Sequence, residues 1–199
     1  NGGEGHWGMV KALVASDAQA NDRYGFSVVT DGNTAVVGAF WEDGGLNDLL
    51  PDSGAAYVYY RDQDGPDNWG EVTIVRAADA LWYDYFSYEV DLSGDRLVVS
   101  AYLEDGGPDN PLSDAGAVYL FDRNQGGADQ WGQVNVLHAS DAQVNDRFGL
   151  SVGLSANFVI AGAYWEDGGA DDPRTDTGAV YIFQLATQSL YLPILLKSQ

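Results

Sequence analysis

Three loops of the sequence concentrate side chains that could bind a metal ion. Each holds Glu-Asp-Gly-Gly followed closely by further acidic residues. Calcium takes about six to eight oxygen ligands, and a loop broken by glycine can bring carboxylate and carbonyl oxygens to one point. The sequence therefore predicts calcium as a candidate ligand. The candidate ligands are Glu42, Asp43, Asp48 and Asp52 in the first loop, Glu104, Asp105, Asp109 and Asp114 in the second, and Glu166, Asp167, Asp172 and Asp176 in the third.

The alternative interpretation of these loops is a solvated acidic surface. Such a surface would keep an otherwise apolar molecule soluble. None of the three loops reproduces the ligand spacing of a known calcium loop. Both interpretations stay open at the level of sequence. No other cofactor is predicted.

One segment matches a catalytic pattern. Residues 149–153 read Gly-Leu-Ser-Val-Gly, which fits the nucleophile elbow with Ser151 as its centre. That elbow needs a strand-to-helix turn and a His further along the chain, whereas Ser151 falls within an expected strand and both His6 and His138 precede it. The chain has no Cys, which excludes thiol catalysis, Cys-ligated zinc and disulfide bonds. We expect a protein that is not an enzyme.

The charge balance narrows the possible partners. The sequence has 30 acidic and 9 basic residues, a formal net charge of -21. This charge repels nucleic-acid phosphates and anionic lipids. No apolar run reaches the length of a membrane-spanning helix. Neither a nucleic-acid partner nor a membrane span is expected.

A repeat organises the chain. Trp-Gly recurs at positions 7, 69 and 131, a constant step of 62 residues that holds without insertion. The repeats are 7–68, 69–130 and 131–188, and an apolar tail follows at 189–199. Because each of these Trp residues stands at the start of an expected strand, packing between repeats is their predicted role. Trp41 and Trp165 adjoin the acidic loops, where sugar stacking is an alternative to packing.

Each repeat predicts four short strands. In the first repeat they are 10–15, 24–30, 34–40 and 55–60, rich in β-branched and aromatic residues and bounded by Gly, Asp and Asn. A tight turn at 31–33 joins the second strand to the third. Four antiparallel strands repeated radially are typical of propeller blades. The predicted fold is all-β, with three four-stranded antiparallel repeats as β-propeller-type blades in one domain; a solenoid is the alternative.

Paired acids recur in the loop between the first two strands. We expect them to cap that loop by accepting backbone N–H bonds. Arg23 and Arg147 follow directly and are candidates to pair with these carboxylates. The paired acids are Asp17 and Asp22, Asp79 and Asp84, and Asp141 and Asp146.

Two short motifs recur at fixed places in these repeats, Phe-Gly and Gly-Ala. They are Phe148-Gly149, Gly38-Ala39 and Gly162-Ala163, with Phe40 and Tyr164 following the last two. With these motifs the repeats resemble FG-GAP repeats, in which Pro stands at the positions of Phe40 and Tyr164, and most closely the Trp-rich tandem arrays of secreted bacterial proteins. The resemblance implies the β-propeller fold of the integrin alpha-subunit head and extracellular adhesion or recognition, and it implies no reaction. The Asp-x-Asp-x-Asp-Gly calcium loop of the integrin type does not occur at 31–33, so that site is not carried over.

These observations predict an extracellular structural or adhesive protein that assembles with itself. Closed propellers use about four to eight blades, so three repeats are too few, and an open stack exposes strand edges that invite association. A filament or a propeller-completing oligomer would form through blade faces and terminal strands, with the tail 189–199 as a docking strand. A start at Asn1 without a leader segment suits a processed secreted protein. The alternative is a module that binds glycan or an extracellular protein through its acidic, aromatic loops, with or without calcium.

Overall fold

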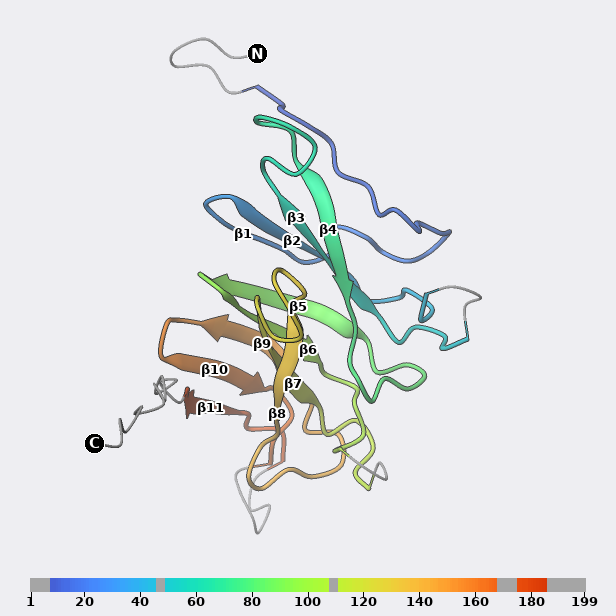
Figure 1. Ribbon diagram of the computed structural model, residues 1–199. Helices are drawn as coiled ribbons and strands as arrows, with labels where there is room; N and C mark the ends of the chain where they lie inside the picture. The colour runs from blue at the N-terminus through green and yellow to red at the C-terminus, as the bar shows by residue number, and fades with distance from the viewer. Residues whose placement is uncertain (1–7, 46–48, 108–110, 168–174, 186–199) are drawn as a thin grey trace, which may run out of the picture.

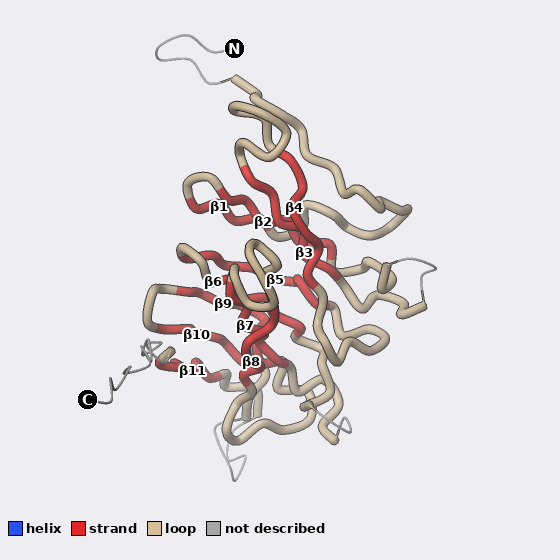
Figure 2. The backbone as a smooth tube through the Cα atoms, in the orientation of Figure 1, coloured by secondary structure: helices blue, strands red, loops and turns tan. Residues whose placement is uncertain are grey.

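The chain forms three antiparallel β-sheets that follow one another as blades (Figure 1). The computed structural model describes residues 8–45, 49–107, 111–167 and 175–185. Within these ranges every regular element is a strand, as Figure 2 shows. Sheet A has the order β1-β2-β3-β4, sheet B the order β5-β6-β7-β8, and sheet C the order β9-β10-β11. The predicted fold class is confirmed, and the sheets do not close into a ring.

The strands are short and evenly spaced. Those of sheet A are β1 (Val28–Asp31), β2 (Thr34–Ala39), β3 (Ala55–Tyr60) and β4 (Gly70–Val75). Those of sheet B are β5 (Phe86–Ser93), β6 (Arg96–Ala101), β7 (Ala117–Asp122) and β8 (Gly132–Leu137). Those of sheet C are β9 (Phe148–Leu154), β10 (Phe158–Ala163) and β11 (Ala179–Gln184).

The sheets are offset from the sequence repeats by one strand. β4 begins the second repeat, yet it pairs with β3 of the first, with Tyr57 opposite Ile74. β8 likewise begins the third repeat and pairs with β7, with Tyr119 opposite Val136. Each complete sheet therefore takes its outer strand from the following repeat.

This offset corrects the prediction of a strand at 10–15. Those residues have no strand assignment, although the equivalent segments one and two repeats later are β4 and β8. A strand needs a hydrogen-bonded neighbour. The neighbour of 10–15 would belong to a preceding repeat, and the described part of the chain holds none.

The hairpin of the first repeat follows the sequence closely. Asp31 pairs with Thr34, so the turn consists of Gly32 and Asn33 and is one residue shorter than the predicted connection 31–33. β1 is shorter than the predicted 24–30, because the chain turns at Gly25, whose φ of 89° is left-handed. The Gly25 N–H donates to the carbonyl of Gly38 at 3.0 Å, so this turn stays attached to β2.

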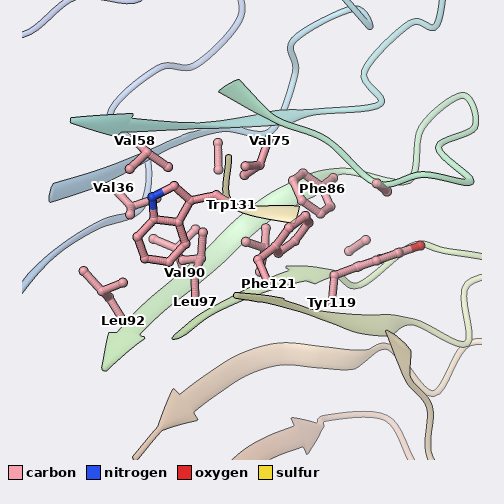
Figure 3. Packing of buried hydrophobic residues seen from close by; sticks show 14 of the residues in the cluster. Val36, Val58, Val75, Phe86, Val90, Leu92, Leu97, Tyr119, Phe121 and Trp131 are labelled. Atoms are coloured by element: carbon pink, nitrogen blue, oxygen red, sulfur yellow. The ribbon is translucent and has the colours of Figure 1, made fainter. Parts of the chain in front are cut away.

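The largest core lies between sheets A and B (Figure 3). Val36 and Val58 of sheet A face Leu97 and Tyr119 of sheet B, and Trp131 fills the space beside them. Trp131 is 1% exposed and its indole N–H donates to the hydroxyl of Tyr60 at 2.9 Å. Packing between blades is thus confirmed for Trp131, while Trp7 lies outside the described residues.

The junction between sheets B and C is also an apolar core between two sheet faces. Val98 and Val118 on the other face of sheet B pack against Phe148, Val159 and Ala161 of sheet C. Both faces of sheet B are therefore buried. Strands buried on both faces read as continuous apolar runs, as Leu97, Val98 and Val99 of β6 do.

The outer face of sheet A is covered by the chain's own N-terminal segment. Leu13 and Ala15 pack in a cluster with Val37 and Tyr57 of this face. The Tyr57 hydroxyl donates to Asp17 Oδ1 at 2.7 Å, which fixes the end of the segment. Figure 1 shows this segment running along sheet A beside β4.

Candidate functional site

The acidic loops fold around their own carboxylates. Glu42 is 4% exposed and accepts the backbone N–H groups of Gly44 at 3.0 Å and Gly45 at 2.6 Å. Arg76 reaches it from the end of β4, with Nη2 at 2.8 Å and Nε at 3.2 Å. Arg76 Nη2 also donates to Asp17 at 3.2 Å, so one guanidinium ties two loops to the following repeat.

The second acidic loop repeats this arrangement with a histidine in place of the arginine. Glu104 accepts from Gly106 at 2.9 Å and Gly107 at 2.7 Å. His138 stands one repeat after Arg76, with Nδ1 3.8 Å from Glu104 Oε2. Glu166 of the third loop is also buried. Glu42 and Glu104 hold their loops closed, a role that sequence reasoning did not assign to them.

The Asp next to each Glu closes the far end of its loop. The first accepts the N–H of Asp52 at 2.8 Å, the second that of Asp114 at 3.0 Å and the third that of Asp176 at 2.6 Å. The three acceptors are Asp43, Asp105 and Asp167. A carboxylate nine positions before its donor thus fixes the width of each loop.

The calcium prediction is untested by this geometry. Within the described residues, no group of three or more His, Asp or Glu side chains is arranged to hold a metal ion. Asp48, Asp109 and Asp172 lie outside the described residues, so none of the three predicted ligand sets is described in full. Calcium therefore stays a prediction.

The second acid of each predicted pair caps its loop as predicted, whereas Asp17 and Asp141 accept the hydroxyls of Tyr57 and Tyr181. Asp22, Asp84 and Asp146 are buried, and each accepts a backbone N–H three positions earlier, at 2.6, 2.6 and 2.7 Å. Burial raises the pKa of Asp84 to about 7, and the charges of Glu104 and Asp105 push it in the same direction. Asp84 is consequently protonated in much of the folded population near neutral pH.

The two arginines take a different partner from the one predicted. The Arg23 guanidinium lies 4.4 Å from the ring centroid of Trp41, and that of Arg147 lies 3.9 Å from that of Trp165. These are cation–π contacts in place of ion pairs with the loop acids. They support a packing role for Trp41 and Trp165.

The outer face of sheet C is the largest departure from the repeat pattern. Ile182 is 68% exposed, whereas its equivalents Val58 and Leu120 are 0% and 8% exposed. Val180 is 64% exposed, while Val118 one repeat earlier is fully buried. The next sheet covers these positions in sheets A and B. The exposed apolar residues of this face, called here the open face, are Phe158, Ile160, Val180 and Ile182.

Two grooves run across the open face. One is lined by Leu154, Phe158, Ile160 and Ile182. The other lies at the opposite end of β10 and β11, between Trp165 and the exposed loop before β11. Sequence reasoning did not find the open face, because Ile182 has the same character as its buried equivalents.

The edge of β11 is also open. β10 pairs with β9 on one side and β11 on the other, and in the described part of the chain β11 has no second neighbour. β3 and β7 each have such a neighbour in β4 and β8. The predicted docking strand 189–199 lies outside the described residues. Ser151 lies within β9, as predicted, and not at a strand-to-helix turn.

A family model described as FG-GAP repeat matches the chain three times, at residues 7–59, 69–121 and 131–183. The matches follow the 62-residue step and cover most of the chain. No curated protein sequence matches it. In the described ranges there is no helix with the length and apolar character needed to cross a bilayer.

Proposed function

The chain belongs to the FG-GAP repeat family, and on that premise we propose that it is an extracellular structural or adhesive protein that assembles with itself. The observation that carries the proposal is the open face of sheet C. Its residues have the types that are buried between blades at the two internal junctions, yet here they face solvent. A large exposed apolar patch on an otherwise acidic protein marks an interaction surface.

The energetics favour covering this face. A side chain of the size of Ile or Phe contributes about 1.5–3 kcal/mol when it is fully removed from water. The four residues of the open face are roughly half to two-thirds exposed. A second blade stacked on them would gain several such contributions, and a net charge of -21 would limit stacking to surfaces that match well.

A structural or adhesive role fits the contacts of the described loop carboxylates. The acidic side chains of the described loops are engaged with backbone N–H groups and with Arg76. This engagement supports a role for them in holding loop shape. We propose no reaction for this protein.

The second candidate function is recognition of a glycan or an extracellular protein. It is favoured by the groove at the end of β11, where Tyr164 and Trp165 are exposed beside Asp176. Aromatic rings next to a carboxylate suit a sugar ring, which stacks on the former and donates hydroxyl bonds to the latter. Saturable quenching of Trp fluorescence by a glycan, lost in Trp165→Ala, would favour this function.

The experiment for self-assembly is the mass of the protein in solution over a range of concentrations. We expect species larger than one chain, and we expect Ile182→Asp to return them to single chains because a carboxylate cannot be buried between blades. The matched control is Leu49→Asp, which places the same charge at a residue that is 69% exposed but lies outside the open face. A single chain at every concentration would contradict the proposal.

A further inference from the structure

Two unpaired segments of this chain complement each other. In the described part of the chain β11 has no second neighbour, and residues 8–15 are a strand-like sequence that lies on sheet A without a strand assignment. We propose that residues 8–15 of a second copy add to β11 as the fourth strand of sheet C. This inference rests on the proposed self-assembly and names the partner and the register.

β4 makes two kinds of contact, pairing with a strand of its own sheet and packing on the next sheet. Residues 8–15 already make the second kind. β4 pairs with β3 and, at its end, also packs on sheet B through Val75 and Ala77. The equivalents of these two residues are Leu13 and Ala15, which pack on sheet A. The segment therefore lies on sheet A as β4 lies on sheet B.

A hydrogen bond repeats at the same place. The N–H of Ala78, just after β4, donates to Gln133 Oε1 at 3.0 Å. One repeat earlier, the N–H of Ser16 donates to Glu71 Oε2 at 3.1 Å. Both the donor and the acceptor are 62 positions apart between the two bonds. The segment is thus preformed for a second role, that of an edge strand on another sheet.

The two complete sheets give the register. In sheet A, Ala56, Tyr57 and Val58 face Val75, Ile74 and Thr73. Sheet B has the same pairs one repeat later, at Val118, Tyr119 and Leu120 with Leu137, Val136 and Asn135. Carried to sheet C and a second copy, this register places Leu13 opposite Val180, Ala12 opposite Tyr181 and Lys11 opposite Ile182.

The same docking would also form the backbone hydrogen bond that recurs at each blade junction. The N–H of Phe86 donates to the carbonyl of Ser53 at 2.9 Å, and that of Phe148 donates to Ala115 at 2.8 Å. The next pair in this series is Tyr24 of the second copy and Thr177, which is exposed in this chain. Both the donor loop and the acceptor loop for such a bond are present.

The loop before Tyr24 has the backbone conformation of the loops at the two internal blade junctions, although no described blade precedes it. Tyr85 and Arg147 stand just before the two junction donors and have left-handed φ values of 56° and 56°. Arg23 has a φ of 58° at the same place. A left-handed conformation is unfavourable for a residue with a side chain. Its presence at Arg23 indicates a loop built to receive a blade.

Beside Gly178, next to the proposed acceptor Thr177, there is space for a backbone carbonyl of a second copy. Gly54 and Gly116 lie so close to the carbonyls of Phe86 and Phe148 that neither position has room for a Cβ. The equivalent Gly178 meets only backbone atoms of its own repeat, the nearest being the Tyr164 carbonyl oxygen at 3.2 Å from an ideal Cβ. In the proposed assembly this space receives the carbonyl of Tyr24.

Each copy then has one donor end and one acceptor end. Such a head-to-tail contact makes a ring if the rotation closes and a filament if it does not. Two copies would supply six blades, which lies within the usual propeller range of about four to eight. The junction is the same in both outcomes.

The test uses the absence of Cys from the chain. Lys11→Cys and Ile182→Cys are made as two separate variants, mixed and oxidised. Opposed residues of antiparallel strands have Cα atoms about 4.5–5.5 Å apart, which suits a disulfide. We expect a covalent pair of chains that forms only in the mixture. The control mixes Ile182→Cys with Val14→Cys, three positions along the same exposed segment, and should give roughly tenfold less product.

The outcomes separate the two proposals. Large species in solution without the Lys11–Ile182 cross-link would overturn strand addition and leave self-assembly standing. Single chains at every concentration would overturn both. A cross-link that appears only after residues 186–199 are removed would show that the chain's own terminus fills the edge, and it would also overturn the inference. The double variant Lys11→Cys/Ile182→Cys then distinguishes a ring, which stops at a fixed size, from a ladder of filaments.

Discussion

Gly54 lies against the backbone carbonyl of Phe86, so closely that the two blades could not meet if residue 54 had a side chain. Gly116 and Phe148 have the same relationship at the next junction. All three equivalent glycines are left-handed, with φ values of 87°, 88° and 73° at positions 54, 116 and 178. All three positions therefore favour glycine because of their left-handed φ. Another blade approaches closely at Gly54 and Gly116 but not at Gly178.

This relationship predicts unequal effects of one substitution. Gly54→Ala and Gly116→Ala should each lower the free energy of unfolding by about 3 kcal/mol or more, because the methyl group overlaps a backbone oxygen. Gly178→Ala should cost only about 1–2 kcal/mol in a single chain, since it meets the φ penalty and a tight contact with its own Tyr164 carbonyl but no overlap with another blade. Urea denaturation at low protein concentration measures all three.

In the assembly, Gly178→Ala should behave differently. The added methyl group would occupy the space proposed for Tyr24 of a second copy, so we expect large species to be lost at concentrations where the wild-type protein forms them. Sedimentation measures this. Unchanged assembly by Gly178→Ala would show that the junction between copies differs from the junctions within the chain.

The cation that faces Glu42 predicts a second asymmetry. Arg76→Met leaves a buried carboxylate with only its two glycine N–H bonds, so the free energy of unfolding should fall by roughly 2–4 kcal/mol. Arg76→His is the matched control, because His138 is the natural residue at the equivalent position beside Glu104. It should cost less than Arg76→Met in urea denaturation, and His138→Arg should stabilise the chain. Equal effects of Met and His would contradict a role for a polar contact with Glu42.

The raised pKa of Asp84 predicts a stability that falls as pH rises. The folded carboxyl has a pKa of about 7, while the pKa of an unfolded Asp lies near its ordinary value of 3.8. Between these values the folded state binds more protons than the unfolded state, so the free energy of unfolding decreases with pH. Asp84→Asn keeps an oxygen to accept from Leu81 and removes the titration. It should stabilise the protein at pH 8, have less effect near pH 4, and flatten the slope between them.

The control for this prediction is Asp62→Asn, at an exposed loop position. The amide oxygen can still accept the N–H of Asp67, which Asp62 Oδ1 accepts at 2.8 Å, so the variant removes one negative charge without removing a buried carboxyl. Thermal melts from pH 4 to pH 8 on both variants give the comparison. A slope that flattens equally in the two variants would assign the pH dependence to the overall negative charge and not to Asp84.

The acidic loops predict a response to calcium. An ion that binds only the folded state raises the melting temperature. The rise grows with the ratio of the ion concentration to the dissociation constant. We expect added calcium to raise the melting temperature and a chelator to lower it, with magnesium as the control because it tolerates irregular oxygen sites less well. The same melting temperature in calcium, magnesium and chelator would leave these loops as solvated surface.

The strands within each repeat could be predicted because local signals define them. The turn at 31–33 and the apolar runs at 34–40 and 55–60 agree with β2 and β3 to within a residue. The segment 10–15 has equally good local signals and is not a strand. Its state depends on a partner from another repeat, which propensity does not contain.

The residues of the candidate site were visible in the sequence to different degrees. The recurrence of Glu-Asp-Gly-Gly could have indicated a carboxylate that binds its own loop, since Glu42 bonds to N–H groups only two and three positions away. The exposure of Ile182 could not be predicted, because it depends on the number of blades and not on the residue. Arg76 was also missed, since its partners Asp17 and Glu42 lie far away in the sequence.

The bonds at the blade junctions have a mechanical consequence. β4 leads to β5 through residues 76–85, and the N–H groups of Tyr83 and Phe86 donate to the carbonyls of Pro51 and Ser53 in the preceding repeat. The connection between these blades is therefore not a free hinge. Tension along the chain would reach the junction as a pull on these bonds and on the core between sheets A and B. A thread built by the same contacts between copies would resist flow with the strength of its blade junctions and not of flexible linkers.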